Sequence, residues 1–133
     1  MAVTLAVPLL RVTDVARSME WYRDTLGFTG DPFPAKPPFE FAILRKGAAE
    51  IMLRRGVPRV SSKPQRYDWD VYLRIEGSRF REVCAHLQIR GIVNRPVEQM
   101  PYGLAEFEIV DPDGHVLCLS QELDNEGDVP RPS

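Results

Sequence analysis

Alternating apolar and polar residues between Glu106 and Gln121 predict a β-hairpin. The apolar residues recur at every second position, which is the period of a strand that buries one face. Residues 111–114 supply the turn, because Pro112 presets φ and Gly114 accepts the left-handed conformation. The residues predicted to face inward are Phe107, Ile109, Leu117 and Leu119.

The second face of this hairpin has a different character. If Asp111 lies opposite His115, Glu108 lies directly across from Cys118. This face carries carboxylates, a thiol and a hydroxyl group, so we expect it to be the side that can meet a ligand. Its members are Glu106, Glu108, Val116, Cys118 and Ser120.

The rest of the chain predicts a βαβββ unit and a second copy of it. Asp14 and Ser78 are expected to cap the two helices, and Gly27 and Gly91 to end them. A proline-rich loop is predicted over 31–38. The first copy comprises strands over 5–12, from Phe28, over 39–44 and over 50–54, with a helix over 15–26. The second comprises strands over 69–76 and 93–100, a helix over 79–89, and the hairpin.

The two copies can be aligned residue by residue. Residues 10–12 (LRV) match 73–75 (LRI), 63 residues later. A second set of matches, 66 residues apart, places Phe41, Ile43, Ile51 and Leu53 on Phe107, Ile109, Leu117 and Leu119. Self-similarity at a fixed period indicates repeated structural units, and a half of about 60 residues buries little apolar surface alone. We therefore predict an α+β fold of two βαβββ modules related by internal duplication.

Length and composition set the boundaries of this prediction. The chain has 133 residues with a net charge of −2, and it has two cysteines, too few for a disulfide framework. We expect a single domain over 1–123, with module 1 at about 5–55, a linker at about 56–66 and module 2 at about 67–122. Residues 124–133 are expected to be a disordered tail. The charge gives no reason to expect nucleic acid as a partner, and no apolar run approaches the roughly 18 residues of a membrane span. A reducing cytoplasm is the default location.

Strand alternation divides the sheet residues into two faces. One face is predicted to pack on the helices: Leu10, Val12, Ile51, Leu53, Val71, Leu73, Ile75, Phe107, Ile109, Leu117 and Leu119. The other mixes apolar residues with both charges, which suits a cleft lining and equally a solvated sheet face. It comprises Val7, Leu9, Arg11, Glu50, Met52, Arg54, Asp70, Tyr72, Arg74, Glu106, Glu108, Cys118 and Ser120.

Two segments resemble a known superfamily. Residues 8–28, PLLRVTDVARSMEWYRDTLGF, resemble the opening of the vicinal oxygen chelate superfamily, and residues 100–115, MPYGLAEFEIVDPDGH, resemble its closing segment. That group holds glyoxalases, bleomycin-resistance proteins and extradiol dioxygenases. The resemblance spans about 7–121 and implies two βαβββ modules that form a U-shaped, open-barrel cleft. It also implies a homodimer, since small members of the group usually dimerise.

Enzymes of this superfamily hold a divalent metal with four side chains, one on each of four cleft-facing strand positions. By resemblance these positions fall on Val7, Met52, Asp70 and Cys118. Valine has no donor atom, and a thioether is a poor ligand for magnesium, nickel or zinc. We therefore expect no metal and no other cofactor. The resemblance is closest to the metal-free bleomycin-resistance branch, which sequesters a drug in an aromatic-lined cleft.

The expected function is thus metal-independent binding of a small molecule, either a drug or antibiotic or a metabolite. Bleomycin itself is disfavoured, because proteins that resist this cationic drug tend to be strongly acidic. Two alternatives stay open: a glyoxalase-like lyase or isomerase that uses Glu108 or Asp70 as a carboxylate base on a small oxygenated substrate, and a module that binds another protein. The predicted ligand contacts are Phe33, Phe39, Met52, Arg54, Trp69, Tyr72, Met100, Tyr102, Glu108 and Cys118.

Several of these candidates also have a structural interpretation. Arg11, Arg54 and Arg74 suit a clamp for a carboxylate or phosphate, but internal salt bridges are the more common outcome. A carboxylate beside Cys118 raises the pKa of its thiol, which favours a packing role. His115 is expected at the edge of the turn and His86 on the surface of a helix. The sequence therefore lends little support to histidine acid/base chemistry.

Overall fold

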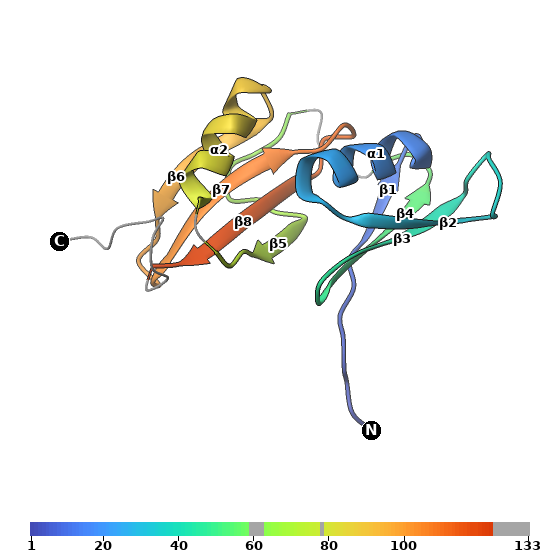
Figure 1. The fold of residues 1–133 in the computed structure, drawn as a ribbon, viewed down its shortest axis with the longest axis horizontal. Helices are drawn as coiled ribbons and strands as arrows, with labels where there is room; N and C mark the ends of the chain where they lie inside the picture. Colours follow the sequence, from blue (N-terminus) through green and yellow to red (C-terminus); the bar gives the residue numbers. More distant parts are fainter. Residues whose placement is uncertain (59–62, 78, 124–133) are drawn as a thin grey trace. The chain divides into compact units, whose positions relative to one another are not determined.

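We describe the chain from a computed structural model, which covers residues 1–58, 63–77 and 79–123 (Figure 1). Two compact units divide the chain, one over Met1–Val60 and one over Ser61–Ser133. The predicted cap Ser78 and the predicted tail at 124–133 lie outside the described residues. Among the helices of the described residues, none has the length and apolar character needed to cross a membrane.

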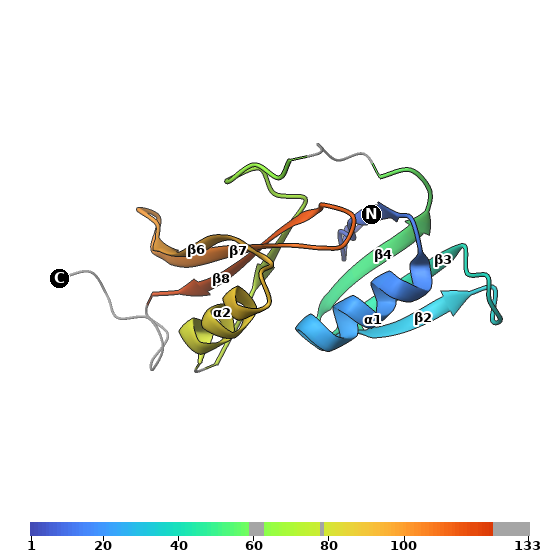
Figure 2. The same cartoon turned by 90° about the horizontal axis from the view of Figure 1, so that it is seen from above.

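Unit 1 is a four-stranded mixed sheet with one helix on it. Its elements are β1 (Leu9–Val12), α1 (Val15–Leu26), β2 (Thr29–Phe33), β3 (Phe41–Lys46) and β4 (Ala49–Arg55), with strand order β1-β4-β3-β2. The first strand runs parallel to β4, and the other pairs are antiparallel. α1 packs on β2, β3 and β4, as Figure 2 shows from above.

Unit 2 repeats this arrangement. Its elements are β5 (Val71–Arg74), α2 (Phe80–Ile89), β6 (Val93–Gln99), β7 (Leu104–Val110) and β8 (Val116–Glu122), with strand order β5-β8-β7-β6. The registers agree as well, since Leu10 pairs with Leu53 in unit 1 and Leu73 pairs with Leu119 in unit 2. The predicted α+β fold of two duplicated βαβββ modules is therefore confirmed.

The helix ends follow from local chemistry. Asp14 accepts the backbone N–H of Arg17 at 3.1 Å and so caps α1, and Gly27 ends it with a φ of 78°. Both roles match the prediction. At α2 the N-cap residue is Arg79, whose φ is 95° and whose side chain makes no capping bond.

The hairpin forms with the predicted register. Phe107 pairs with Leu119 and Ile109 with Leu117, while Glu108 lies across from Cys118. The four inward-facing residues are almost completely buried, and α2 contributes Phe80 to the same core, with its ring 4.9 Å from that of Phe107. The predicted set of helix-packing residues is otherwise buried, except that Leu73 and Ile75 are only half-buried.

Three sequence predictions need correction. The match of Phe41 and Ile43 to Phe107 and Ile109 is wrong by one residue, because Ala42 pairs with Leu53 and takes the core position. The two hairpins differ in length, so one constant period cannot align both strands. Part of the predicted proline loop, 31–33, belongs to β2, an edge strand where proline is tolerated. β1 and β5 are also shorter than predicted, beginning at Leu9 and Val71.

Candidate functional site

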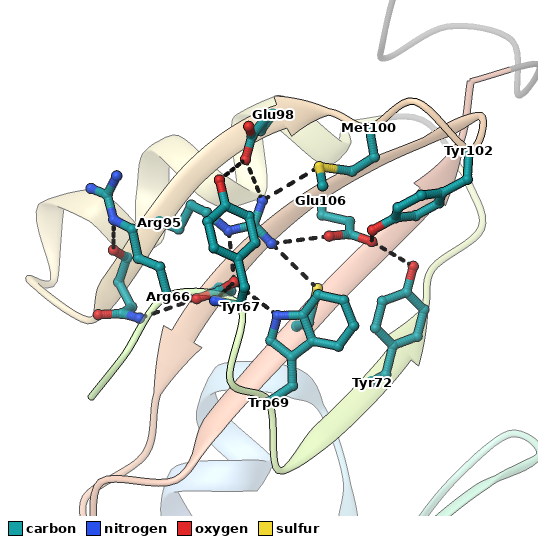
Figure 3. Close-up of polar contacts among 12 residues, drawn as sticks. Arg66, Tyr67, Trp69, Tyr72, Arg95, Glu98, Met100, Tyr102 and Glu106 are labelled. Carbon is teal, nitrogen blue, oxygen red and sulfur yellow. Dashed lines mark hydrogen bonds and ion pairs between the residues drawn. The ribbon is translucent and has the colours of Figure 1, made fainter. Parts of the chain in front are cut away.

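The outer face of the unit 2 sheet is closed by its own side chains. Glu106, Glu108, Cys118 and Ser120 face away from α2, and all four are completely buried. This differs from the expectation that they are open to a ligand. The cause is Arg95 of β6, which lies over the sheet among three carboxylates (Figure 3).

Arg95 is the centre of this cluster. It is 2% exposed, and its Nε lies 2.6 Å from Oε2 of Glu108. Its Nη2 lies 3.0 Å from Oε1 of Glu106, and its Nη1 lies 2.8 Å from Oε1 of Glu98. Burial lowers the pKa of Arg95, but the hydrogen bonds to Glu108 and Glu106 raise it by more. The net pKa lies above its ordinary value, so the guanidinium stays charged.

Sequence analysis missed Arg95, and the register explains why. Val93 pairs with Ile109 on the helix-facing side, so simple alternation would place Arg95 on that side too. A register shift between Val93 and Arg95 instead pairs Arg95 with Glu108. Of the other outer-face arginines considered, Arg74 bonds Ser120 and Glu122, and Arg11 and Arg54 belong to unit 1. The one arginine of the predicted strand at 93–100, VNRPVEQM, was the available signal.

Glu108 is a saturated acceptor. Its Oε2 accepts the backbone N–H of Tyr67 at 2.9 Å, the indole N–H of Trp69 at 2.8 Å and the guanidinium of Arg95. Its Oε1 accepts the amide of Asn94 at 3.1 Å. Burial raises the pKa of Glu108, but these hydrogen bonds, led by the one from Trp69, lower it below its ordinary value. A stabilised carboxylate of this kind is a poor proton acceptor.

Two tyrosines complete the coordination of Glu106. Oε2 accepts the hydroxyl of Tyr102 at 2.6 Å and the hydroxyl of Tyr72 at 2.9 Å. Burial, together with the neighbouring carboxylate, raises the pKa of both phenols, so each remains a protonated donor near neutral pH. The predicted contacts Tyr72 and Tyr102 therefore meet at one carboxylate (Figure 3).

Aromatic rings form the rim of the cluster. Tyr67 lies over the guanidinium of Arg95 at 4.3 Å, and its hydroxyl donates to Glu98 at 2.7 Å. The rings of Trp69 and Tyr72 lie 5.0 Å apart. Tyr67 adopts a φ of 67°, a rare conformation for a residue other than glycine, and its backbone bond to Glu108 holds it there.

Met100 and Cys118 are the remaining predicted contacts in this unit. The sulfur of Met100 lies 3.8 Å from Nη1 of Arg95, and that of Cys118 lies 4.0 Å from Nη2. Burial, then the charge of Glu106, raises the pKa of the Cys118 thiol. The structure thus gathers Trp69, Tyr72, Met100, Tyr102, Glu108 and Cys118 around Arg95.

Unit 1 presents a different outer face. Phe33 and Phe41 are cross-strand partners with ring centroids 6.1 Å apart, and the guanidinium of Arg54 lies 5.3 Å from the Phe41 ring. Met52 lies one row away, between Leu9 and Ile43. Three predicted contacts, Phe33, Met52 and Arg54, therefore share this face.

Phe39 lies apart from that group. It lines a cavity of about 380 Å³ beside α1. Met19 and Gly30 are among the other lining residues, and Gly30 pairs with the core residue Leu44, so this cavity lies on the helix side of the sheet. The predicted contacts Phe39 and Phe33 therefore do not share one face of this sheet.

His115 has a structural partner. It is buried at the turn, and its Nδ1 lies 2.8 Å from Oδ2 of Asp111. Oδ1 of Asp111 accepts the backbone N–H groups of Asp113 and His115. The histidine therefore locks the loop between β7 and β8, while His86 is exposed on α2.

The sequence model of the Glyoxalase/Bleomycin resistance protein/Dioxygenase superfamily matches residues 4–119, nearly the whole chain. The chain belongs to this superfamily. No curated protein matches it.

Several solved structures share the fold. TioX from Micromonospora sp. ML1 superposes with a TM-score of 0.69 at 24% identity, covering 90% of this chain and 99% of TioX. A glyoxalase-related enzyme from Clostridium phytofermentans gives 0.71 at 17% identity, covering 92% and 97%. A glyoxalase/bleomycin resistance protein/dioxygenase from Alicyclobacillus acidocaldarius gives 0.70 at 14%, covering 91% and 92%. Identities this low support the fold alone.

The superfamily implies a metal site, and the residues present do not fit one. In unit 1, Val7 and Met52 occupy the expected positions and offer no nitrogen or oxygen donor. In unit 2, Oδ2 of Asp70 accepts the backbone N–H of Val116 at 2.9 Å, and the thiol of Cys118 is buried with a raised pKa. Across the described ranges, no group of three or more histidine, cysteine or acidic side chains is placed to hold a metal ion.

Proposed function

We propose that this superfamily member is a metal-independent small-molecule-binding protein of the bleomycin-resistance type, which sequesters a drug, antibiotic or metabolite. One observation carries the proposal: the outer face of the unit 1 sheet keeps large apolar side chains within reach of solvent. Leu9 is 50% exposed and Phe33 is 45% exposed, and Phe41, Ile43 and Met52 beside them are only half-buried.

Such a face suits a planar, apolar ligand. The exposed residues are neighbours across four strands, so they form one continuous surface. Each Å² of apolar surface buried against this face contributes roughly 25 cal/mol of favourable transfer free energy. Offset or edge-to-face contacts of a ligand ring with Phe33 and Phe41 add to it. A contiguous apolar surface with a few polar groups at its margin is typical of ligand sites.

Unit 2 has an aromatic surface of its own. Tyr67, Tyr72 and Tyr102 are 52%, 37% and 55% exposed, although their hydroxyl groups are hydrogen-bonded. Their ring faces remain available for stacking, while Glu106 and Glu108 lie beneath. In this proposal the predicted aromatic contacts of this unit act through their ring surfaces. Glu108 holds Trp69 by a hydrogen bond, and Cys118 lies beside Arg95.

The alternative of a carboxylate-base lyase or isomerase gains less support. Glu108 is buried, accepts hydrogen bonds at both oxygens and has a lowered pKa. Asp70 is engaged with the backbone of Val116. Glu108 therefore lacks both the free oxygen and the raised pKa that favour a general base near neutral pH.

Native mass spectrometry of the untreated protein tests the proposal most directly. We expect a homodimer without stoichiometric metal, and any additional organic mass would identify a ligand. A thermal-shift screen of planar aromatic compounds follows, comparing Phe33→Ala with Ile89→Ala. Ile89 is 86% exposed at the end of α2, so its truncation removes exposed apolar surface that is not part of the unit 1 sheet. Ligand shifts should shrink in Phe33→Ala only.

The contrary result is equally specific. One metal ion per subunit, with turnover that chelation abolishes, would contradict metal-independent binding. That result would support the lyase or isomerase alternative, in which Asp70 is a candidate residue.

A further inference from the structure

We propose that the outer face of unit 1 binds an aromatic acid, meaning a planar ring that carries a carboxylate or a similar oxyanion. This inference rests on the proposed function and names the class of its ligand. It is carried by one row of side chains across the four strands: Arg11, Arg54, Phe41 and Phe33.

The sheet register places these residues side by side. Arg11 of β1 pairs with Arg54 of β4, Arg54 pairs with Phe41 of β3, and Phe41 pairs with Phe33 of β2. Paired residues on neighbouring strands point to the same face, and neighbouring strands lie about 4.8 Å apart. Two cationic side chains are thus adjacent at one end of the row, and two aromatic rings are adjacent at the other.

The two arginines lack the carboxylate partners that would make them a structural salt bridge. Acidic side chains do lie on this face, but Arg45 holds them, at 3.1 Å from Glu50 and 3.9 Å from Asp31. Within the part of the chain that the structure describes, no carboxylate lies within ion-pair distance of Arg11 or Arg54. Among the described residues, the Arg54 side chain instead packs over the Phe41 ring.

A pair of adjacent guanidinium groups has a definite chemical preference. Like charges on neighbouring strands are unfavourable, and an anion between them removes that cost. Guanidinium donors match the two oxygens of a carboxylate, and charge-assisted hydrogen bonds are about twice as strong as neutral ones. The charge at this end of the row therefore selects an oxyanion and disfavours a cationic ligand.

The rest of the row sets the shape of the ligand. The Phe41 ring lies 5.3 Å from the Arg54 guanidinium and 6.1 Å from the Phe33 ring. An oxyanion joined directly to a fused bicyclic ring spans such distances, so the ring would lie against Phe41 and Phe33. Ile43 and Met52, in the adjoining row, would extend the apolar contact.

The experiment compares two probes of equal shape by isothermal titration calorimetry: 2-naphthoate and its neutral amide. We expect the acid to bind at least tenfold more tightly than the amide, with an affinity that falls as salt is added. Arg11→Gln and Arg54→Gln should each weaken the acid by about tenfold and leave the amide unchanged. Arg55→Gln is the matched control, because Arg55 is exposed like Arg54 but is bound to Glu40, 2.9 Å away.

Three results would overturn the inference. The first is equal binding of acid and amide, and the second is a loss of binding in Arg55→Gln as large as in Arg54→Gln. The third is that this face mediates self-association. In that case the wild-type protein is a dimer that binds no naphthoate, and the Arg11→Gln/Arg54→Gln double variant is a monomer.

These results separate the ligand class from the wider function. If acid and amide bind equally and Phe33→Ala weakens both, the apolar face binds ligands and only the preference for an oxyanion is wrong. Titration of inorganic phosphate alone tests whether anion binding at the arginines requires an attached ring. The inference requires phosphate to bind far more weakly than 2-naphthoate.

Discussion

Arg95 and Glu108 form an ion pair inside unit 2, with Nε and Oε2 2.6 Å apart and side-chain exposures of 2% and 0%. Two further carboxylates and an aromatic ring complete the environment of the guanidinium. Removing charges from water is costly, and only close, fully hydrogen-bonded geometry compensates for it. The outer face of this sheet is therefore held together as one interdependent polar network.

Replacement of Arg95 tests this interdependence. Arg95→Met should lower the free energy of unfolding by about 3–5 kcal/mol at pH 7, because it leaves Glu106 and Glu108 buried without a cation. The deficit should shrink on acidification, since protonation of the carboxylates removes the uncompensated charge. Urea denaturation of the variant and the wild type at pH 7 and pH 5 measures both effects.

Arg55→Gln is the control for that experiment. Arg55 pairs with Glu40 at 2.9 Å, but both side chains are more than half exposed, so its loss should cost less than about 1 kcal/mol. Equal losses in the two variants would mean that burial of Arg95 has no energetic consequence.

The His115–Asp111 pair predicts a pH-dependent stability. Burial lowers the pKa of His115, but the hydrogen bond and charge of Asp111 raise it above the ordinary value. A raised pKa in the folded state means that the stabilisation is complete below about pH 6.5 and is lost as the pH rises through the folded-state value. The stability difference between wild type and His115→Gln should therefore be largest near pH 6 and should fall toward pH 9.

Asp111→Asn provides a second test of the same pair. The amide oxygen can still accept the backbone N–H groups of the turn, but the negative charge is gone. In this background the stabilisation that His115 contributes at low pH should be lost, because burial then lowers its pKa against only the charges of Asp70 and Asp113. Chemical denaturation across pH 6–9 would contradict the explanation if the slope persisted.

Both cysteines should be unreactive in the folded protein. Cys84 and Cys118 are buried, and burial is the main cause that raises the pKa of each thiol. The thiolate is the reactive species, so alkylation by iodoacetamide at pH 8 should be far slower in native protein than in urea. Peptide mapping by mass spectrometry separates the two sites, and rapid native labelling of Cys118 would show that the Arg95 cluster opens readily.

The cap of α1 allows a simple stability prediction. Asp14 accepts the N–H of Arg17, so Asp14→Ala should cost about 1 kcal/mol of unfolding free energy. Asp14→Asn retains an oxygen acceptor and should stay within a few tenths of a kcal/mol of wild type. Thermal and urea unfolding of the two variants compare them directly, and equal losses would assign the effect to the negative charge instead of the hydrogen bond.

Much of the fold could be predicted because its signals are local. The alternation around Phe107 and Leu119, the cap at Asp14 and the stop at Gly27 each depend on residues close in the chain. The duplication was visible because similar residues recur in the first and last strands of both units, which pair in the same way. Its fine alignment was not, since hairpin length moved Ala42 into the position expected for Phe41.

The candidate sites could likewise be predicted from the sequence only in part. The sequence indicated which residue types lie on the outer faces, and the aromatic residues Trp69, Tyr72 and Tyr102 do come together. It did not identify Arg95, because a register shift in β6 determines which face that side chain takes. It also left the partners of Arg54 open, because ion pairs depend on which strands are neighbours.

The sequence by itself determined the two modules, their helices and the inward-facing side of the terminal hairpin, since periodicity and capping are properties of short segments. Only the tertiary structure decided that the two outer faces differ. In unit 2 a bulged edge strand brings a cation onto Glu106 and Glu108, so the face closes on itself. In unit 1 Arg45 takes the nearby carboxylates, which leaves Arg54 over an aromatic ring. The physical reason is that buried charges must find partners, and which partners are within reach depends on strand order and register.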